Sequence, residues 1–226
     1  MTTVQPFHTL TGIAAPLLHA DIDTDAIAPS RFRPATLSKY GYEAALFAGL
    51  RFDEDGAQRP GFVLDQTPYR DAVILVTGPN FGCGSSRETA VWALRDFGIR
   101  AVIAPSFGSI FETNCLRNGL LPLSLPPAEH RQLVEAAFAP AASARLRIDL
   151  DTCRLTTATG PQPTFTTGFT IDERSRQQLL NGLDPIGETL LLRETITRFR
   201  TRDRRHRPWN YPAPPPRPQA GRCPAD

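Results

Sequence analysis

The middle of the chain, residues 72–123, alternates short apolar runs with amphipathic stretches. The runs at 72–77, 101–104 and 120–123 consist mainly of Ala, Val, Ile and Leu, which is typical of parallel strands buried on both faces. Between them, apolar residues recur at helical spacing from Ser85 onward and over 106–118, and Gly98 and Gly119 follow as stop signals. The pattern predicts a β-α-β-α-β unit, and therefore an α/β fold with a mainly parallel core.

Further elements are predicted on both sides of this core. Additional strands are expected at 7–13, 146–150, 154–159 and 164–170, of which 146–150 and 154–159 form a hairpin. C-terminal helices are expected at about 127–138, from an N-cap at Asp172 to Gly182, and from Asp184-Pro185 to about Phe199. Residues 30–70 mix Gly, Pro and charged residues and are expected to be mostly loop.

Charge divides the chain into two parts. The 226 residues have a formal net charge of +2, but eight arginines and two aspartates lie between Arg198 and the C-terminus. This segment therefore carries +6 and the first 197 residues carry −4. A basic nucleic-acid-binding domain is not organised in this way, so no nucleic-acid partner is expected. Nucleic-acid binding through Arg198–Arg207 is the alternative from another functional class. We expect one domain over 1–203 and an Arg- and Pro-rich tail over 204–226 that is disordered or extended.

Cysteine spacing and apolar content exclude several classes of protein. Cys83, Cys115, Cys153 and Cys223 form no C-x-x-C pair, so no zinc or iron–sulfur ligand set is visible, and no disulfide framework is expected. No apolar run approaches the length of a membrane span, and the N-terminus has no basic region followed by a long apolar stretch. The sequence therefore favours a cytoplasmic protein that does not bind membranes.

Candidate chemistry is concentrated in residues 78–88, between a predicted strand and a predicted helix. Gly82 and Gly84 allow backbone amides to approach a ligand, and Arg87 at a helix N-terminus suggests a bound carboxylate or phosphate. A second interpretation is a capping box, Ser85-x-x-Glu88, with glycines that only make a tight turn. A dinucleotide fingerprint fails because Arg87 stands at its third glycine, and a Walker A loop fails because the segment has no lysine.

Four segments in the same order resemble one family. The segment Gly82-Cys83-Gly84-Ser85-Ser86-Arg87-Glu88, followed by Ala93-Leu94, resembles the signature of the aconitase-like swivelling-domain family, and most closely its 3-isopropylmalate dehydratase (isopropylmalate isomerase) small subunits. The other segments are Asp23–Ile27, Ile103–Phe107 with Asn118–Pro122, and Leu179–Gly187. The resemblance spans roughly residues 5–195. Thr89 stands where the family usually has histidine, and the tail has no counterpart.

The resemblance implies a swivelling β/β/α domain and a hydro-lyase activity. Family members interconvert 2- and 3-isopropylmalate by dehydration and rehydration in leucine biosynthesis. A separate large subunit carries a 4Fe-4S cluster, so this chain is expected to bind no cofactor itself and to act on a small dicarboxylate hydroxy acid only with that partner. Related small subunits that serve homoaconitate, citraconate/methylmalate or dimethylmalate hydro-lyases are the alternatives.

The same motifs imply roles for individual residues. Ser85 would act as an alkoxide base, stabilised by backbone amides and Arg87, and Arg87 would also hold a substrate carboxylate. Ser86 and Gly84 would contact substrate, and Asp25 would be an active-site carboxylate, with a turn-forming role as its alternative.

Other candidates are weaker. Arg31 or Arg33 would reach the substrate or be solvated. Cys83 is expected to be a small residue beside the site rather than a nucleophile, because no histidine lies in its segment. Cys115 is expected in the core, and Trp92 and Phe111 in packing or a subunit interface.

Overall fold

The computed structural model describes residues 4–32, 41–139, 144–158 and 162–211 of the chain. Residue contacts divide the chain into two compact units, Met1–Pro185 and Ile186–Asp226, and each is described by itself. The strands are β1 (Thr9–Leu17), β2 (Ile74–Thr77), β3 (Ala101–Ala104), β4 (Leu121–Ser124), β5 (Arg145–Asp149), β6 (Arg154–Thr157) and β7 (Thr166–Gly168). The helices of the first unit are α1 (Thr24–Ile27), α2 (Ala48–Arg51), α3 (Thr89–Phe97), α4 (Ser109–Arg117), α5 (Pro127–Phe138) and α6 (Glu173–Asn181).

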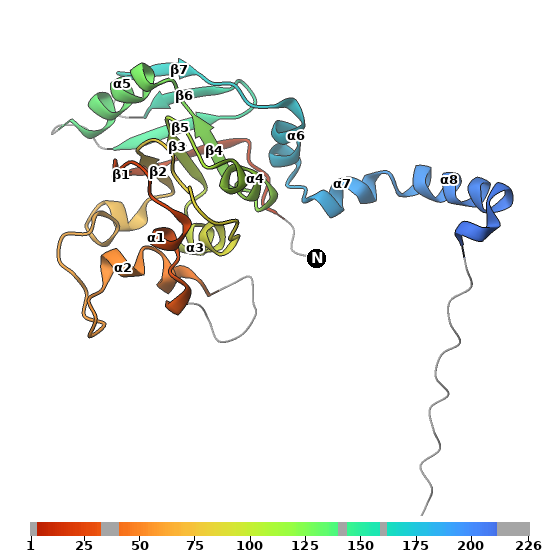
Figure 1. The fold of residues 1–226 in the computed structure, drawn as a ribbon. Helices are drawn as coiled ribbons and strands as arrows, with labels where there is room; N and C mark the ends of the chain where they lie inside the picture. Colours follow the sequence, from red (N-terminus) through yellow and green to blue (C-terminus); the bar gives the residue numbers. More distant parts are fainter. Residues whose placement is uncertain (1–3, 33–40, 140–143, 159–161, 212–226) are drawn as a thin grey trace, which may run out of the picture. The chain divides into compact units, whose positions relative to one another are not determined.

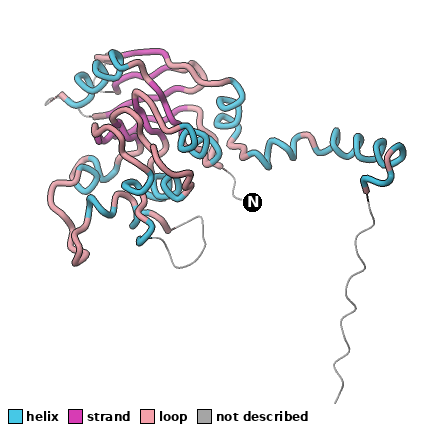
Figure 2. Tube along the Cα trace, viewed as in Figure 1, coloured by secondary structure: helices cyan, strands magenta, loops and turns pink. Residues whose placement is uncertain are grey.

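One sheet organises the first unit. Its strand order is β4-β3-β2-β1-β5-β6-β7, with β1 to β4 parallel and β5 to β7 antiparallel (Figures 1 and 2). The first strand of the chain lies in the middle of this sheet. It pairs in parallel with β2 (Ala14 with Ile74) and antiparallel with β5 (Thr9 with Asp149). This arrangement confirms the predicted α/β fold with a mainly parallel core and additional strands.

Two apolar cores lie on the two faces of the sheet. Every residue of β2 and β3 is fully buried, because alternate side chains point into different cores. Ile74 and Val76 pack with residues of α5 and α6, whereas Leu75 packs with residues of α1, α3 and α4. In Figure 1, α5 lies on one side of the sheet and α1 and α3 lie on the other. The continuous apolar runs in the sequence thus follow from burial on both faces.

Several predicted boundaries are confirmed and others are wrong. Helix α5 begins and ends where predicted, β5 and β6 form the predicted hairpin, and Asp172 accepts a hydrogen bond from the Ser175 amide (2.9 Å) as an N-cap. The first strand is longer than predicted. Residues 41–71 contain, besides α2, the 3-10 turns Glu43–Ala45, Val63–Asp65 and Tyr69–Asp71. The helix predicted from Asp184 to Phe199 is two helices, α7 (Pro185–Leu191) and α8 (Arg193–His206).

The second unit consists of α8, most of α7 and the 3-10 turn Pro208–Asn210. Asp203 closes the end of α8, because it accepts hydrogen bonds from Arg207 Nε (2.7 Å) and from the Tyr211 hydroxyl (3.0 Å). The predicted domain boundary at residue 204 falls inside α8, and residues 212–226 of the predicted tail lie outside the described residues. No helix in the described part of the chain is long and apolar enough to span a bilayer.

Candidate active site

The loops that follow β1 and β2 are joined by main-chain hydrogen bonds. The Gly82 amide donates to the Ile22 carbonyl (2.7 Å), and the Thr24 amide donates to the Cys83 carbonyl (3.0 Å). Phe81 is bonded in the same way to the loop that follows β3. Carboxyl ends of parallel strands are the usual ligand-binding edge of an α/β sheet. The segment carrying the predicted chemistry is therefore fixed by backbone pairing at this edge.

The two glycines are needed for the path of this segment. Gly82 has φ +74°, and a Cβ atom there would lie only 2.2 Å from Cγ of Phe111. The Phe111 ring is 2% exposed and packs edge-on against Phe81, so it belongs to the core. Gly84 has φ +90°, and a Cβ atom there would lie 3.5 Å from Cβ of Asp23. Both positions need a left-handed backbone, which glycine adopts without steric cost.

Ser85 is not a helix cap, so the capping-box interpretation is wrong. Helix α3 begins at Thr89, and Glu88 occupies the N-cap position without a side-chain cap. The backbone pairing of residues 81–83 delays the start of the helix by four residues. The Glu88 carboxylate instead accepts a hydrogen bond from the Asn118 side chain (3.4 Å). The Ser85 hydroxyl is therefore available for another role.

The Ser85 hydroxyl is held by Thr24, a residue for which the sequence predicted no role. The two hydroxyl oxygens lie 2.8 Å apart, and Thr24 Oγ1 also lies 3.3 Å from the Ser85 carbonyl oxygen. Thr24 is only 1% exposed, so its rotamer is fixed by packing. Its position between Asp23 and Asp25 in a predicted site motif is the one signal that could have identified it.

Asp25 and Arg87 form an ion pair across the same edge. The Arg87 side chain is 32% exposed and that of Asp25 is 53% exposed. Asp23, rather than Asp25, has the turn-forming role, because its carboxylate accepts a hydrogen bond from the Ala26 amide (2.7 Å) and caps α1. Helix α1 thus presents Thr24 to Ser85 and Asp25 to Arg87. The structure therefore brings together the three residues predicted to be catalytic.

Residues 85–88 carry backbone donors that can bind a ligand. Within the described part of the chain, the amides of Ser85, Ser86, Arg87 and Glu88 have no hydrogen-bond acceptor. Ser86 and Gly84 are exposed beside them. Successive free amides with a nearby guanidinium make a site that is suited to an anion.

Cys83 is unsuited to nucleophilic chemistry. Partial burial, followed by the negative charges of Asp23 and Asp21, raises the pKa of the Cys83 thiol above its ordinary value of 9.0. Its Sγ atom lies 3.6 Å from the Asp21 carbonyl oxygen. The thiol therefore stays protonated at neutral pH, and only thiolates are strong nucleophiles. Cys115 is fully buried in the core, as predicted.

The remaining candidates do not add a ligand to the site. Arg31 is exposed, and its guanidinium lies 4.9 Å from the centre of the Phe32 ring. It forms no ion pair with Asp25 among the described residues. Arg33 lies outside the described residues. The Trp92 indole donates to the Asn118 side chain (3.1 Å), which is a packing contact. Nowhere in the described ranges do three or more His, Cys, Asp or Glu side chains gather in a way that could hold a metal ion.

Thr89 carries a buried hydroxyl without a partner. Its Oγ1 atom is inaccessible to solvent and has no hydrogen-bond partner among the described residues. Thr89 is the first residue of α3 and directly follows Glu88. A buried hydroxyl without a partner destabilises the fold, so this position is a candidate for stabilising substitution.

Comparison with known proteins relates the chain to one family. The Aconitase C-terminal domain family matches residues 4–128. The 3-isopropylmalate dehydratase small subunit of Cupriavidus necator is 48% identical over 208 residues, which cover 91% of this chain and 98% of the relative. The 3-isopropylmalate dehydratase small subunit of Rhodospirillum centenum is 47% identical over 206 residues, with the same coverage.

A solved structure agrees with these relatives. The crystal structure of 3-isopropylmalate dehydratase from Methanocaldococcus jannaschii superposes with a TM-score of 0.57 and is 27% identical. The match covers 85% of this chain and 99% of that chain. Similarity in sequence and in fold therefore extends over nearly the whole length of the relatives.

Proposed function

Since this chain belongs to the family of 3-isopropylmalate dehydratase small subunits, we propose that it completes a cytoplasmic hydro-lyase that interconverts 2- and 3-isopropylmalate in leucine biosynthesis. The observation that carries the proposal is the group of Thr24, Ser85, Arg87 and Asp25 at the carboxyl edge of the sheet. The described residues do not fit a 4Fe-4S cluster, so we place the cluster on the large subunit, where its iron would act as a Lewis acid on the substrate hydroxyl.

Ser85 is the proposed base. Its oxygen takes the proton from the carbon next to a substrate carboxylate. The C–H electron pair forms the new double bond, and the C–O bond on the adjacent carbon breaks, so the hydroxyl leaves with its bonding pair as hydroxide. In the reverse direction the same oxygen returns the proton. A serine hydroxyl is a very weak acid, so the alkoxide has to be stabilised where it forms. The Thr24 hydroxyl lies at this oxygen, and the free amides of residues 85–88 and the Arg87 guanidinium are the other donors proposed to stabilise the anion.

Arg87 is the proposed carboxylate ligand. A guanidinium holds a carboxylate through two parallel hydrogen bonds, which lysine cannot reproduce. In the free chain Asp25 pairs with Nη1 of Arg87, so a substrate carboxylate binds through the remaining nitrogens or displaces Asp25. The Ser86 hydroxyl and the Gly84 amide are exposed beside Arg87 and are proposed as further substrate contacts.

Reconstitution with the large subunit under anaerobic conditions tests the proposal. We expect turnover of 2- and 3-isopropylmalate, no turnover with Ser85→Ala, and a raised KM with Arg87→Lys. Ser86→Ala is the matched comparison, because it removes a neighbouring hydroxyl that is proposed to contact substrate but takes no proton, so it should raise KM and keep most of kcat. Ser85→Ala should cost less than about 1.5 kcal/mol of stability, because it removes one hydrogen bond and leaves every helix cap in place.

Other outcomes would refute separate parts of the proposal. Near-wild-type rates for both Ser85→Ala and Arg87→Lys would contradict the catalytic assignment. A kcat/KM that is higher on homoaconitate, citraconate or dimethylmalate than on isopropylmalate would support the proposed dehydration chemistry but contradict the proposed substrate. Stoichiometric iron and sulfide in the purified chain alone would contradict the placement of the cluster.

A further inference from the structure

The second unit exposes most of the large apolar side chains that are accessible in the described part of the chain. Ten large apolar side chains are exposed in the whole described part of the chain, and seven of them lie between Ile186 and Trp209. Scattered exposed apolar residues are normal, but a concentration in one short unit indicates a surface that is covered in the working assembly.

Leu192, the N-cap residue of α8, forms an apolar stripe with Ile196 and Phe199 of the helix. Leu192 is 58% exposed, Ile196 is 37% exposed and Phe199 is 49% exposed. Their spacing of four and three residues places them on one face of the helix. In α7, Ile186 and Leu190 have the same four-residue spacing and are also exposed. This surface has the anchor pattern of a helix that lies in a groove of another protein.

The rest of α8 is strongly basic. The helix contains six arginines and two acidic residues, and one of these, Asp203, is already bonded to Arg207 and Tyr211. Arginines therefore flank the apolar stripe on both sides. This charge opposes pairing with a second copy of the chain and favours an acidic surface.

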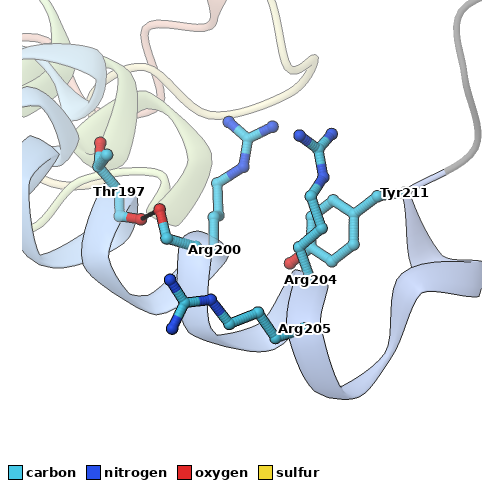
Figure 3. A pocket seen from close by; sticks show the side chains of 6 residues that line it. Thr197, Arg200, Arg204, Arg205 and Tyr211 are labelled. Atoms are coloured by element: carbon cyan, nitrogen blue, oxygen red, sulfur yellow. Dashed lines mark hydrogen bonds between the residues drawn. The ribbon is translucent and has the colours of Figure 1, made fainter.

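Three of these arginines line a groove on α8. The groove has a volume of about 410 Å³ and is lined by Thr197, Arg200, Thr201, Arg204, Arg205 and Tyr211 (Figure 3). Arg200 and Arg204 extend in the same direction, and the guanidinium of Arg204 lies 5.2 Å from the centre of the Tyr211 ring. Neither has an ion-pair partner among the residues that the structure describes. Paired guanidinium groups of this kind fit carboxylates of a partner.

The two helices belong to the length shared with the relatives. The match covers 91% of this 226-residue chain. Residues 25–200 therefore lie inside it, whether the unmatched part is at the N-terminus or at the C-terminus. It therefore includes α7 and the whole apolar stripe. The relatives are named as small subunits, so a partner subunit is available to cover this surface.

We propose that α7 and α8 dock onto the large subunit, in an apolar groove with an acidic rim. Leu192, Ile196 and Phe199 are the buried contacts, and Arg200 and Arg204 pair with carboxylates of the rim. The inference rests on the proposed function only for the existence of the large subunit. It is tested by affinity rather than by turnover, so the two can fail separately.

The test measures the Kd between the full-length chain and the purified large subunit at about 50 and 300 mM NaCl. Ile196→Ser/Phe199→Ser should raise Kd by about tenfold or more at both salt concentrations. Arg200→Glu/Arg204→Glu should raise Kd by about tenfold or more at low salt and flatten the salt dependence. The control Glu194→Ser introduces a serine on the opposite face of α8, outside the groove, and should leave Kd within about twofold.

Three results would overturn the docking proposal. The first is a wild-type Kd for the Ile196/Phe199 variant. The second is a fall in its melting temperature of more than about 5 °C relative to the control variant, which would show that the stripe packs within its own chain. The third is loss of binding to RNA, or to vesicles containing anionic lipid, by the Arg200/Arg204 variant while its affinity for the large subunit is unchanged.

Discussion

Thr24→Val separates the proposed catalytic role of the Thr24–Ser85 hydrogen bond from its structural role. Valine has nearly the shape of threonine, so the substitution removes the hydroxyl from a site that is 1% exposed without leaving a cavity. It eliminates the hydrogen bond of 2.8 Å to Ser85 Oγ and the hydrogen bond of 3.3 Å to the Ser85 carbonyl oxygen.

The magnitude differs between the resting protein and the reaction. A neutral hydrogen bond contributes about 0.5–1.5 kcal/mol to folding, and water can replace it at the partly exposed Ser85. A hydrogen bond to a charged oxygen contributes about 1.5–3 kcal/mol. If Ser85 acts as an alkoxide during the reaction, Thr24→Val should therefore lower kcat by about 10- to 150-fold.

The assay measures kcat and KM of the reconstituted complex that contains Thr24→Val, together with the urea unfolding of the same variant. Thr24→Ser is the matched control, because it keeps the hydroxyl and removes only the methyl group, so it should keep kcat within about threefold. A Thr24→Val complex with kcat within about threefold of wild type would refute the role of this hydrogen bond in stabilising the Ser85 anion.

Three further predictions concern stability, measured by urea unfolding. Gly82→Ala should lower the free energy of unfolding by about 2–5 kcal/mol, because the alanine would have a strained left-handed backbone and would overlap with Phe111. Gly98→Ala has the backbone strain alone, since Gly98 has φ +112° and no atom near its Cβ position, so it should cost about 1–2 kcal/mol. Equal losses for the two variants would contradict the overlap with Phe111. Thr89→Val should raise stability by about 1 kcal/mol, and a decrease would show that the hydroxyl has a partner. Burial lowers the pKa of His130 below 6.5. The unfolded state therefore binds more protons than the folded state, and the free energy of unfolding should fall as the pH drops through about 6.5. His130→Leu should weaken this pH dependence, and an unchanged pH profile of stability would contradict the role of His130.

Local patterns predicted most of the first unit because each signal is contained within a few residues. The runs at 101–104 and 127–138 match β3 and α5, since burial on both faces and helical spacing are properties of one segment. The cap at Asp172 and the stop at Gly98 are likewise set by their own neighbourhoods.

Contacts between distant residues explain what the sequence could not predict. The capping box at Ser85 and Glu88 is locally sound, but pairing with the loop after β1 holds the chain extended and moves the helix start to Thr89. Thr24 meets Ser85 across 61 positions, and no local pattern marks that contact. The break between α7 and α8 at Leu192 has neither Pro nor Gly to signal it.

The central position of β1 has a consequence for biosynthesis. Residues Thr9–Leu17 leave the ribosome before both of their partners, because they pair with Ile74 onward on one side and with Arg145–Asp149 on the other. At about 5–20 residues per second, the chain between Thr9 and Asp149 takes roughly 7–30 s to synthesise. Throughout that interval the strand has at least one open hydrogen-bonding edge, which is the feature that promotes edge-to-edge aggregation. Truncated products that end before Asp149 should therefore be aggregation-prone, and the nascent chain is a natural client for chaperones that cover such an edge.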